Sequence, residues 1–373
     1  MTQQLICQLC SKIYASGDFR YCCSCGGVLD LEFESGIDLD KIVSRKPGLW
    51  RYREVLPVED DANIISFDEG FTPLVEVDIS GRGVLFKLEQ LFTTGSFKDR
   101  GAAVLVSKIK ELGITEVVED SSGNAGCAVA AYCAKAGIAC TIFAPELTSA
   151  GKLAQIRSYG ARLELIPGSR EDTTRAVLEA AKNTYYASHF YNPYFFHGTK
   201  TFAYEVAEQL NWRAPDTIIT PVGHGSLLLG AALGFRELRQ AGIIEKTPKF
   251  IGVQAAACCP LHQGFEQNLD EAPTIDKQGT IAEGIAIAEP LRDRQILQAI
   301  RSSGGHTIIV TEDEIKRSLV AMARQGLYIE PTSAVAPAAV GKYLKTAPAD
   351  ETIVSVFTGH GLKATDKILK FVG

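Results

Sequence analysis

A lysine between a predicted strand and a predicted helix is the first candidate for chemistry. Lys98 lies in the sequence GSFKDRG at residues 95–101. At the base of a cleft, the loss of surrounding water favours the neutral amine, which is the form that attacks a carbonyl carbon and forms an imine. A lone lysine at a helix start is more often a solvated surface charge. Lys98 is therefore interpreted together with the other motifs of the chain.

The sequence SSGNAG at residues 121–126 stands directly before an apolar helix and is the second candidate. Two serine hydroxyls and the first backbone N–H groups of that helix make a suitable place for a carboxylate. The side-chain amide of Asn124 could contact the hydroxyl of a cofactor. An ordinary helix cap and turn uses the same residue types, so this motif alone does not separate a binding site from a structural turn.

A glycine-rich loop, PVGHGSLLLG at residues 221–230, connects a third predicted strand–helix pair. Its backbone amides from Gly223 to Leu227 can surround a phosphate at the start of the helix. The loop lacks the lysine of a nucleotide-binding loop and the GxGxxG pattern of a dinucleotide site. His224 could act as an acid or a base, but its place inside the loop favours a packing role.

The sequence FTGHGLK at residues 357–363 follows the last predicted strand and supplies a hydroxyl. Thr358, at the carboxyl end of that strand, can hydrogen-bond to a pyridine nitrogen. A neutral partner leaves such a nitrogen unprotonated and moderates its capacity to withdraw electrons. The structural alternative is another turn.

Cysteine spacing near the N-terminus predicts a metal-binding knuckle. Cys7 and Cys10 form one C-x2-C pair, and after eleven residues Cys22 and Cys25 form a second. Two such turns place four thiolates at tetrahedral zinc distances, and four protein ligands make the site structural rather than catalytic. Cys23 is an extra thiol, which leaves the third ligand open between Cys22 and Cys23. Free thiols, or a knuckle held by hydrogen bonds alone, are the alternatives.

Apolar segments alternate between strand-like and helix-like patterns over most of the chain. This alternation predicts an α/β fold of two doubly wound parallel-sheet domains with a ligand in the cleft between them. An extended segment is expected at residues 49–58. The expected strands are 84–89, 115–120, 139–145, 161–167, 216–223, 249–254 and 351–359, and the expected helices are 99–113, 124–137, 149–160, 169–183 and 226–242.

Composition favours an enzyme of the cytoplasm. Of 373 residues, 46% are hydrophobic and 22% are charged, with a formal net charge of −6 and no long basic run, so nucleic acid is an unfavoured partner. No stretch is long and apolar enough for a membrane span, and the first residues do not resemble a signal peptide. The five cysteines outside the knuckle lie in apolar segments, as in proteins of a reducing compartment.

Together these motifs resemble those of threonine synthase and its relatives, pyridoxal-phosphate enzymes of fold type II. The resemblance runs through nearly the whole chain and includes the N-terminal knuckle with LWRYREVLP, EGFTPL, GSFKDRG, SSGNAG, GTKTFAYE, TIAEGIAI, EPTSA and TGHGLK. It implies a zinc-ribbon-like knuckle at residues 1–35, an N-terminal arm at 36–75, a smaller α/β domain at 100–190, and a larger cofactor domain formed by 76–99 and 191–373. It also implies a homodimer.

The resemblance also implies roles for the candidate residues. Lys98 would form the Schiff base with pyridoxal phosphate and later act as acid and base at the substrate carbons. Asn124 would contact the 3-hydroxyl of the cofactor, and Thr358 its ring nitrogen. The cofactor phosphate would be held by Gly223, His224, Gly225, Ser226 and Leu227, and the substrate carboxylate by Ser121, Ser122, Gly123 and Ala125.

One stretch departs from the family pattern N-P-x-R-x-E-G-Q-K-T. In NPYFFHGTKT, at residues 192–201, Phe195 stands in place of the arginine, His197 in place of the glutamate and Thr199 in place of the glutamine. A dianionic phosphate needs paired cationic donors, and phenylalanine supplies none. Lys200 remains, and a protonated His197 could contribute.

The sequence therefore predicts elimination or replacement at the β or γ carbon of a small amino acid, first of all the conversion of O-phosphohomoserine to threonine and phosphate. A threonine or serine dehydratase is the main alternative, favoured by Phe195, and β-replacement is a third. A non-catalytic binding protein on this fold is opposed by the joint presence of Lys98, Asn124 and Thr358. A nucleic-acid-binding zinc ribbon is opposed by the acidic balance.

Overall fold

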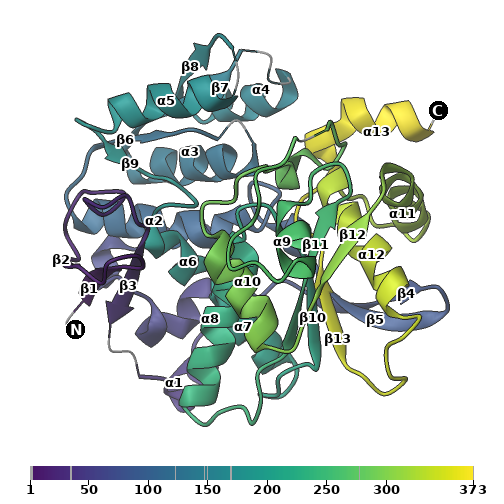
Figure 1. The fold of residues 1–373 in the computed structure, drawn as a ribbon. Helices are drawn as coiled ribbons and strands as arrows, with labels where there is room; N and C mark the ends of the chain where they lie inside the picture. Colours follow the sequence, from purple (N-terminus) through teal and green to yellow (C-terminus); the bar gives the residue numbers. More distant parts are fainter. Residues whose placement is uncertain are drawn as a thin grey trace. The chain divides into compact units, whose positions relative to one another are not determined.

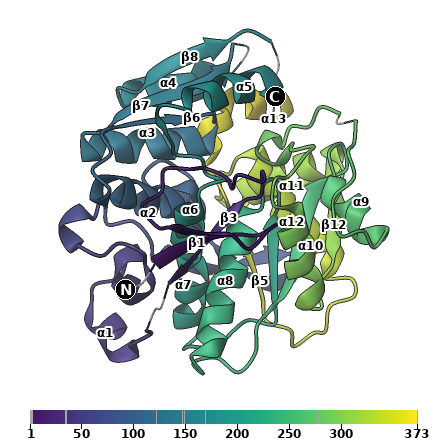
Figure 2. The same cartoon turned by 60° about the vertical axis from the view of Figure 1, so that its left-hand side comes forward.

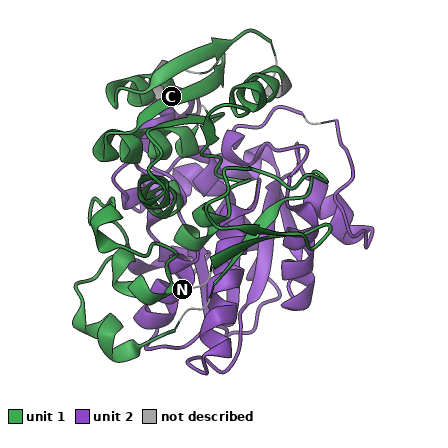
Figure 3. Cartoon of the chain, turned by 90° about the vertical axis from the view of Figure 1, so that its left-hand side faces the viewer, with its two compact units in different colours: residues 1–70, 98–199 green, residues 71–97, 200–373 purple. Residues whose placement is uncertain are grey.

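A computed structural model describes residues 3–33, 36–121, 123–146, 148, 150–168, 170–276 and 278–372. The chain forms two compact units, coloured separately in Figure 3. Unit 1 comprises residues 1–70 and 98–199, and unit 2 comprises residues 71–97 and 200–373. The chain therefore passes from one unit to the other three times, after Gly70, after Phe97 and after Thr199.

Unit 1 begins with a small antiparallel sheet in the strand order β2-β1-β3. We call residues 3–33, which contain β1 (Gln3–Cys7), β2 (Ile13–Ala15) and β3 (Leu29–Phe33), the knuckle. Leu5, Leu29 and Leu31 of this sheet are buried in one core with helices of the same unit. The views in Figures 1 and 2 place β1 and β3 beside helices α2 (Lys98–Glu111) and α6 (Pro193–Thr199).

The segment that follows is helical where the sequence predicted an extended chain. It contains α1 (Leu39–Ser44) and the 3-10 helices η1 (Leu49–Val55) and η2 (Asp61–Asn63). The prediction was wrong over residues 49–55 because Leu49, Tyr52 and Val55 are spaced by three, so two successive turns of 3-10 helix bury all of them.

The main sheet of unit 1 is wholly parallel, in the order β8-β7-β6-β9. Helices α3 and α5 lie on its two faces (Figures 1 and 2). Helix α3 ends where Gly137 adopts a left-handed conformation, as a glycine after a helix commonly does. The elements are β6 (Glu116–Glu119), α3 (Asn124–Ala136), β7 (Ala139–Pro145), α4 (Ala150–Ser158), β8 (Arg162–Ile166), α5 (Arg170–Ala180) and β9 (Tyr185–Tyr186).

Unit 2 contains a six-stranded mixed sheet in the order β12-β11-β10-β13-β5-β4. Its strands are β4 (Leu74–Ile79), β5 (Arg82–Lys87), β10 (Thr217–Pro221), β11 (Lys249–Ala255), β12 (Thr307–Val310) and β13 (Ile353–Val356). The α/β fold is confirmed, although β4 runs antiparallel to β5. Ser80 and Gly81 connect these two strands with positive φ angles of 58° and 85°, the conformation of a tight hairpin turn.

Helices cover both faces of this sheet, with α12 against its strands on one side and α8 and α10 on the other (Figure 1). Among the described helices, none has the length and the apolar character needed to cross a membrane. The helical elements of unit 2 are η3 (Glu89–Leu91), α7 (Thr201–Gln209), α8 (Ser226–Gln240), α9 (Pro260–Glu266), η4 (Glu283–Ile285), α10 (Asp293–Ser302), α11 (Glu312–Arg324), α12 (Pro331–Tyr343), η5 (Gly361–Ala364) and α13 (Thr365–Val372).

A buried ion pair joins strand β5 to helix α7 inside unit 2. Lys87 Nζ lies 2.8 Å from Glu205 Oε2, and both side chains are fully buried. Lys87 also donates to the carbonyl of Thr72 and to Gln209 Oε1. The ammonium is therefore compensated by one charge and two neutral acceptors, as buried charges require.

We expect Glu205→Ala to lower the free energy of unfolding by about 3 kcal/mol, because it leaves the Lys87 ammonium buried without its carboxylate. Denaturant unfolding followed by circular dichroism measures this. Lys246→Ala is the matched control, since it removes an ion pair to Asp216 in which the lysine side chain is 62% exposed, and such pairs contribute less than about 1 kcal/mol. Equal losses in the two variants would contradict the prediction.

Candidate active site

Lys98 is the first residue of helix α2 and the first residue of unit 1 after the chain leaves unit 2. Its Nζ lies over the ring of Phe195, 5.6 Å from the ring centroid. Phe195 belongs to α6, which follows the sheet of unit 1, and is fully buried. An apolar ring therefore forms one wall beside the candidate amine.

Gly101 makes this arrangement possible. A Cβ atom at residue 101 would lie only 2.3 Å from ring carbons of Phe195, so a side chain there would displace the ring. Helices α2 and α6 approach closely because α2 carries no side chain at that position. Gly101, the last residue of GSFKDRG, thus sets the distance between the helix that carries Lys98 and the helix that carries Phe195.

The serine-rich turn stands at the start of α3, at the carboxyl end of β6. Gly123 is the N-cap of α3, and as a glycine it has no side chain to cap the helix. Its backbone N–H donates to Ser121 Oγ at 3.3 Å. Ser121, Ala125 and the Asn124 Oδ1 atom are buried. Ser122 lies outside the described residues. The turn and Lys98 both belong to unit 1, and this helix start is suited to a carboxylate.

The glycine loop of unit 2 begins helix α8. Gly225 is its N-cap, with a φ angle of 77°, and a Cβ there would lie 2.5 Å from Ile296 Cδ1. Because a glycine caps the helix, the N-cap residue has no side chain to cover the N–H groups of Ser226 and Leu227. Gly223 is buried and His224 half-buried. The backbone at residues 223–227 is thus suited to a phosphate.

Thr358 is buried in unit 2, two residues after β13. Its Oγ1 lies 3.0 Å from Ser333 Oγ, and Ser333 Oγ also accepts the N–H of Gly359 at 2.7 Å. The carbonyl of Thr358 accepts the N–H of Phe97 at 3.1 Å. Ser333 therefore orients Thr358, a role that the sequence analysis did not assign, although Ser333 lies in the EPTSA motif.

These groups fit pyridoxal phosphate by their chemistry. Unit 1 supplies an amine, an amide and a helix start, and unit 2 supplies a phosphate-sized backbone loop and an oriented hydroxyl. The loop provides N–H donors where a side chain at residue 225 would not fit. Within unit 1 the groups suit the aldehyde and the 3-hydroxyl of that cofactor, and within unit 2 they suit its phosphate and its ring nitrogen.

The stretch 192–201 offers little to a substrate phosphate. His197 Nε2 lies 3.3 Å from the carbonyl oxygen of Leu31 in the knuckle, and its ring packs beside Phe33. Lys200 Nζ is 2.9 Å from Glu237 Oε1 in unit 2. Burial lowers the pKa of Lys200, and the Glu237 charge partly opposes this effect. The two basic side chains near Phe195 in the sequence therefore already have protein partners.

Two buried carboxyl groups at the end of β6 were missed by the sequence analysis. Glu119 is fully buried, and its Oε1 lies 2.7 Å from His189 Nδ1. Asp120 Oδ1 accepts the hydroxyl of Tyr186 at 2.7 Å. Burial raises the pKa of Glu119 well above its usual range. The signal in the sequence was a pair of acidic residues ending an apolar strand, directly before SSGNAG.

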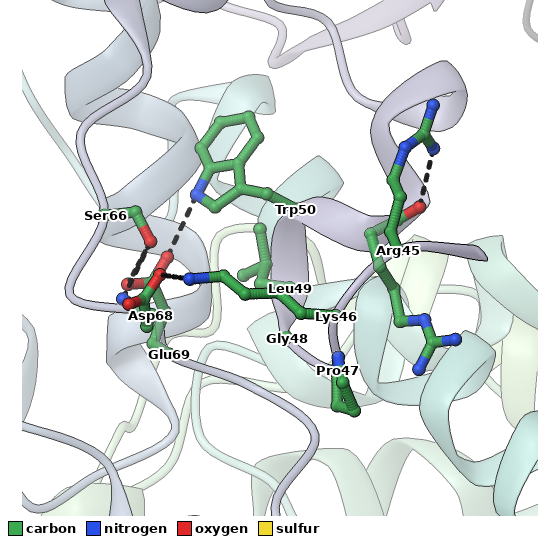
Figure 4. Close-up of a pocket in the computed structure, with 10 residues that line it drawn as sticks. Arg45, Lys46, Pro47, Gly48, Leu49, Trp50, Ser66, Asp68 and Glu69 are labelled. Atoms are coloured by element: carbon green, nitrogen blue, oxygen red, sulfur yellow. Dashed lines mark hydrogen bonds and ion pairs between the residues drawn. The ribbon is translucent and has the colours of Figure 1, made fainter. Parts of the chain in front are cut away.

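A separate cavity of about 310 Å³ lies in unit 1 near the 3-10 helix η1 (Figure 4). Trp50 Nε1 donates to Glu69 Oε1 at 3.0 Å, and Ser66 Oγ donates to the other oxygen of Glu69. Lys46 pairs with Asp68 at 2.6 Å. None of the predicted site residues that the structure describes lines this cavity, and dashed lines in Figure 4 join Trp50 and Ser66 to Glu69 and Lys46 to Asp68.

The cysteine cluster contains Cys23 in place of Cys22. Sulfur atoms of Cys7, Cys10, Cys23 and Cys25 all lie within 4.8 Å of one another. Zinc–sulfur bonds of about 2.3 Å put tetrahedral sulfurs about 3.8 Å apart, so the four thiols fit a structural zinc ion. Cys22 was the wrong choice because the turn buries Cys23, whose sulfur lies 3.0 Å from the Tyr14 hydroxyl.

Comparison with known proteins identifies relatives of the whole chain. A family model described as pyridoxal-phosphate dependent enzyme matches residues 65–359. Threonine synthase of Methanocaldococcus jannaschii is 37% identical over 98% of this chain and 94% of its own length. Threonine synthase of Methanosarcina acetivorans is 35% identical over 98% of this chain and 93% of its own length.

Solved structures show the same fold. Processed threonine deaminase isoform 2 from Solanum lycopersicum superposes with a TM-score of 0.70 at 22% identity, covering 91% of each chain. Serine racemase from Dictyostelium discoideum gives a TM-score of 0.64 at 28% identity, covering 78% of this chain and 92% of its own.

We expect the purified protein to bind one zinc ion per chain, and Cys23→Ser to lower zinc content and affinity by about tenfold or more, because it removes one of four thiolates. Cys22→Ser is the matched control, since its sulfur lies outside the cluster. Elemental analysis and chelator competition measure both. A larger loss of zinc in Cys22→Ser than in Cys23→Ser would instead support Cys22 as the third ligand.

Proposed function

The chain belongs to the family of pyridoxal-phosphate-dependent enzymes, within it to the threonine synthases, and from this premise we propose that it converts O-phosphohomoserine to threonine and phosphate. The observation that carries the proposal is Lys98, which begins helix α2 beside a buried aromatic wall in a chain that matches threonine synthases over nearly its whole length. The reaction class is elimination or replacement at the β or γ carbon of a small amino acid.

The side chains have separate tasks in this proposal. Pyridoxal phosphate, when bound, withdraws electrons from the α carbon of the substrate. Lys98 holds the cofactor and then moves protons at the substrate carbons. The turn formed by Ser121, Ser122, Gly123 and Ala125 holds the substrate carboxylate, and Asn124 contacts the cofactor hydroxyl. The cofactor phosphate is held by residues 223–227 and the ring nitrogen by Thr358.

A serine or threonine dehydratase is the second candidate, and Phe195 is the observation that favours it. This buried ring stands where the family pattern has an arginine, and the ring cannot pair with the phosphate of a substrate. His197 and Lys200 also have partners of their own, Leu31 and Glu237. A substrate whose leaving group is a hydroxyl needs none of these cations.

We infer further that the enzyme is a cytoplasmic homodimer with zinc in the knuckle. Among the described residues the cysteines form no disulfide bond, which supports a reducing compartment. The resemblance to threonine synthases supports the dimer, and the clustered sulfurs of Cys7, Cys10, Cys23 and Cys25 support the zinc.

Lys98→Ala should abolish the visible absorbance band of the cofactor–lysine Schiff base and lower turnover by at least about 10²–10⁴-fold, because an acid–base group is lost. The protein should stay folded by circular dichroism. Lys110→Ala, on the last turn of the same helix, is the control and should retain the band. A band that persists in Lys98→Ala would mean that another lysine holds the cofactor.

A substrate screen separates the two candidate reactions. We expect the cofactor-loaded enzyme to release phosphate and form threonine from O-phosphohomoserine. Parallel assays follow the release of phosphate and of keto acid when threonine, serine or O-phosphoserine is the substrate. Keto acid from threonine or serine, with O-phosphohomoserine inert, would select the dehydratase and make Phe195 the cause of the change.

A further inference from the structure

Both candidate reactions involve an oxygen atom on the β carbon of the substrate. Water adds there in threonine formation and leaves from there in dehydration. Hydroxide is a poor leaving group, so its departure needs a proton donor, and by microscopic reversibility the same group accepts a proton when water adds. Lys98 is occupied at the α carbon in this scheme, so a second acid–base group is required.

The buried carboxyl of Glu119 is placed for this task. It ends strand β6, two residues before Ser121 of the turn that is suited to the substrate carboxylate. The neighbouring parallel strand β9 ends at Tyr186, and His189 follows it. Ligands of parallel α/β sheets bind at such carboxyl ends. Glu119 and His189 therefore meet at the edge of the sheet where a substrate is expected.

The contacts of Glu119 leave one oxygen atom available. Oε1 lies 2.7 Å from His189 Nδ1, which fixes the carboxyl plane. Oε2 is buried and has no hydrogen-bond partner within the part of the chain that the structure describes. A buried oxygen without a partner is costly in a folded protein. Such an atom is retained more readily where a ligand completes its bonding.

The same aromatic ring borders this pair and the lysine. His189 packs edge-on against Phe195, with ring centroids 6.0 Å apart, and Lys98 Nζ lies 5.6 Å from the Phe195 centroid. All four residues belong to unit 1. The amine and the carboxyl thus occupy one small region of a single compact unit.

We propose that Glu119, positioned by His189, is a catalytic acid–base group that carries the proton of the substrate's β-oxygen. This inference rests on the proposed function, because it assumes that Lys98 removes the α proton of an amino acid. It assigns a β-hydroxy amino acid to this site, as the substrate of dehydration or as the product of hydration.

The surroundings of Glu119 favour its protonated form. Burial raises the pKa of Glu119 most, the charge of Asp120 adds to this, and Cys140 contributes further. Lys98 acts in the opposite direction. His189 faces the carboxyl directly. Burial raises the pKa of Tyr186 on β9, and the charges of Asp120 and Glu119 add to this. The protonated form therefore persists to higher pH than in an ordinary glutamic acid.

The dehydration step balances with these two groups. Lys98 takes the α proton, and the electron pair of that C–H bond forms the double bond between the α and β carbons. The C–O bond breaks, its electron pair stays on oxygen, and Glu119 Oε2 supplies the proton, so water departs. Glu119 then regains a proton from solvent, and Lys98 releases to solvent the proton that it took from the α carbon. The unsaturated amine is then hydrolysed by water to keto acid and ammonia.

Glu119→Gln tests the assignment when two leaving groups are compared in the cofactor-loaded enzyme. We expect serine turnover to fall by about 10²–10⁴-fold. Turnover of β-chloroalanine should change by less than about threefold, because chloride leaves without a proton. Exchange of the α hydrogen of serine with deuterium, followed by NMR, should persist because Lys98 is intact. Glu116→Gln is the matched control, an exposed glutamate on the same strand.

The first of two further measurements does not depend on turnover. The infrared band of a protonated carboxylic acid should be present in the wild-type protein and absent in Glu119→Gln. The alkaline limb of the pH profile with serine should also disappear in the variant. His189→Gln keeps a hydrogen bond to Glu119 and should lower turnover of serine more than turnover of β-chloroalanine, which tests the pair if Glu119→Gln does not fold.

The possible failures are distinguishable. Equal losses with serine and β-chloroalanine, or an unchanged rate with serine, would overturn the role of Glu119. A wild-type enzyme that exchanges the α hydrogen of neither serine nor O-phosphohomoserine, and releases neither phosphate nor keto acid, would overturn the proposed function instead.

Discussion

The close approach of helices α2 and α6 is the constraint on which the candidate site depends. Gly101 has no side chain, so the Phe195 ring packs directly on α2, one turn after Lys98. The ring separates the lysine amine from polar surroundings on that side and also contacts His189. Because interiors are packed as densely as crystals, a larger residue at position 101 would alter the surroundings of the amine, the ring and the imidazole at once.

The elements that the sequence predicted well are those with strong local signals. Apolar strands followed by amphipathic helices predicted the parallel sheets, and the glycine loop and serine-rich turn were correctly placed at helix starts. Strand β4, which pairs antiparallel with the predicted strand β5, lay outside the alternation of strands and helices, and the segment at 49–58 has a spacing of three that was interpreted as extended. The Glu119–His189 pair spans 70 residues, and sequence spacing carries no information on such a contact.

Electrostatic balance bears on the choice between the two candidate leaving groups. In unit 1, Lys98 lies over the ring of Phe195, and that ring also packs against His189, the partner of Glu119. In unit 2, Lys200 is compensated by Glu237, which also accepts a hydrogen bond from Tyr204. A buried carboxyl raises the cost of bringing a dianion nearby. The phosphate of O-phosphohomoserine must therefore be bound by groups other than Phe195, His197 and Lys200, whereas a hydroxyl leaving group needs no such cation.

The knuckle is joined to α6 by two hydrogen bonds, one from the Tyr194 hydroxyl to the carbonyl of Ser16 and one between His197 and the carbonyl of Leu31. Phe195 lies between these two attachment points. Removing the first 33 residues to obtain a minimal catalytic core would release the helix whose ring adjoins the reactive amine. An engineer who shortens this enzyme must therefore treat its N-terminal appendage as part of the catalytic scaffold.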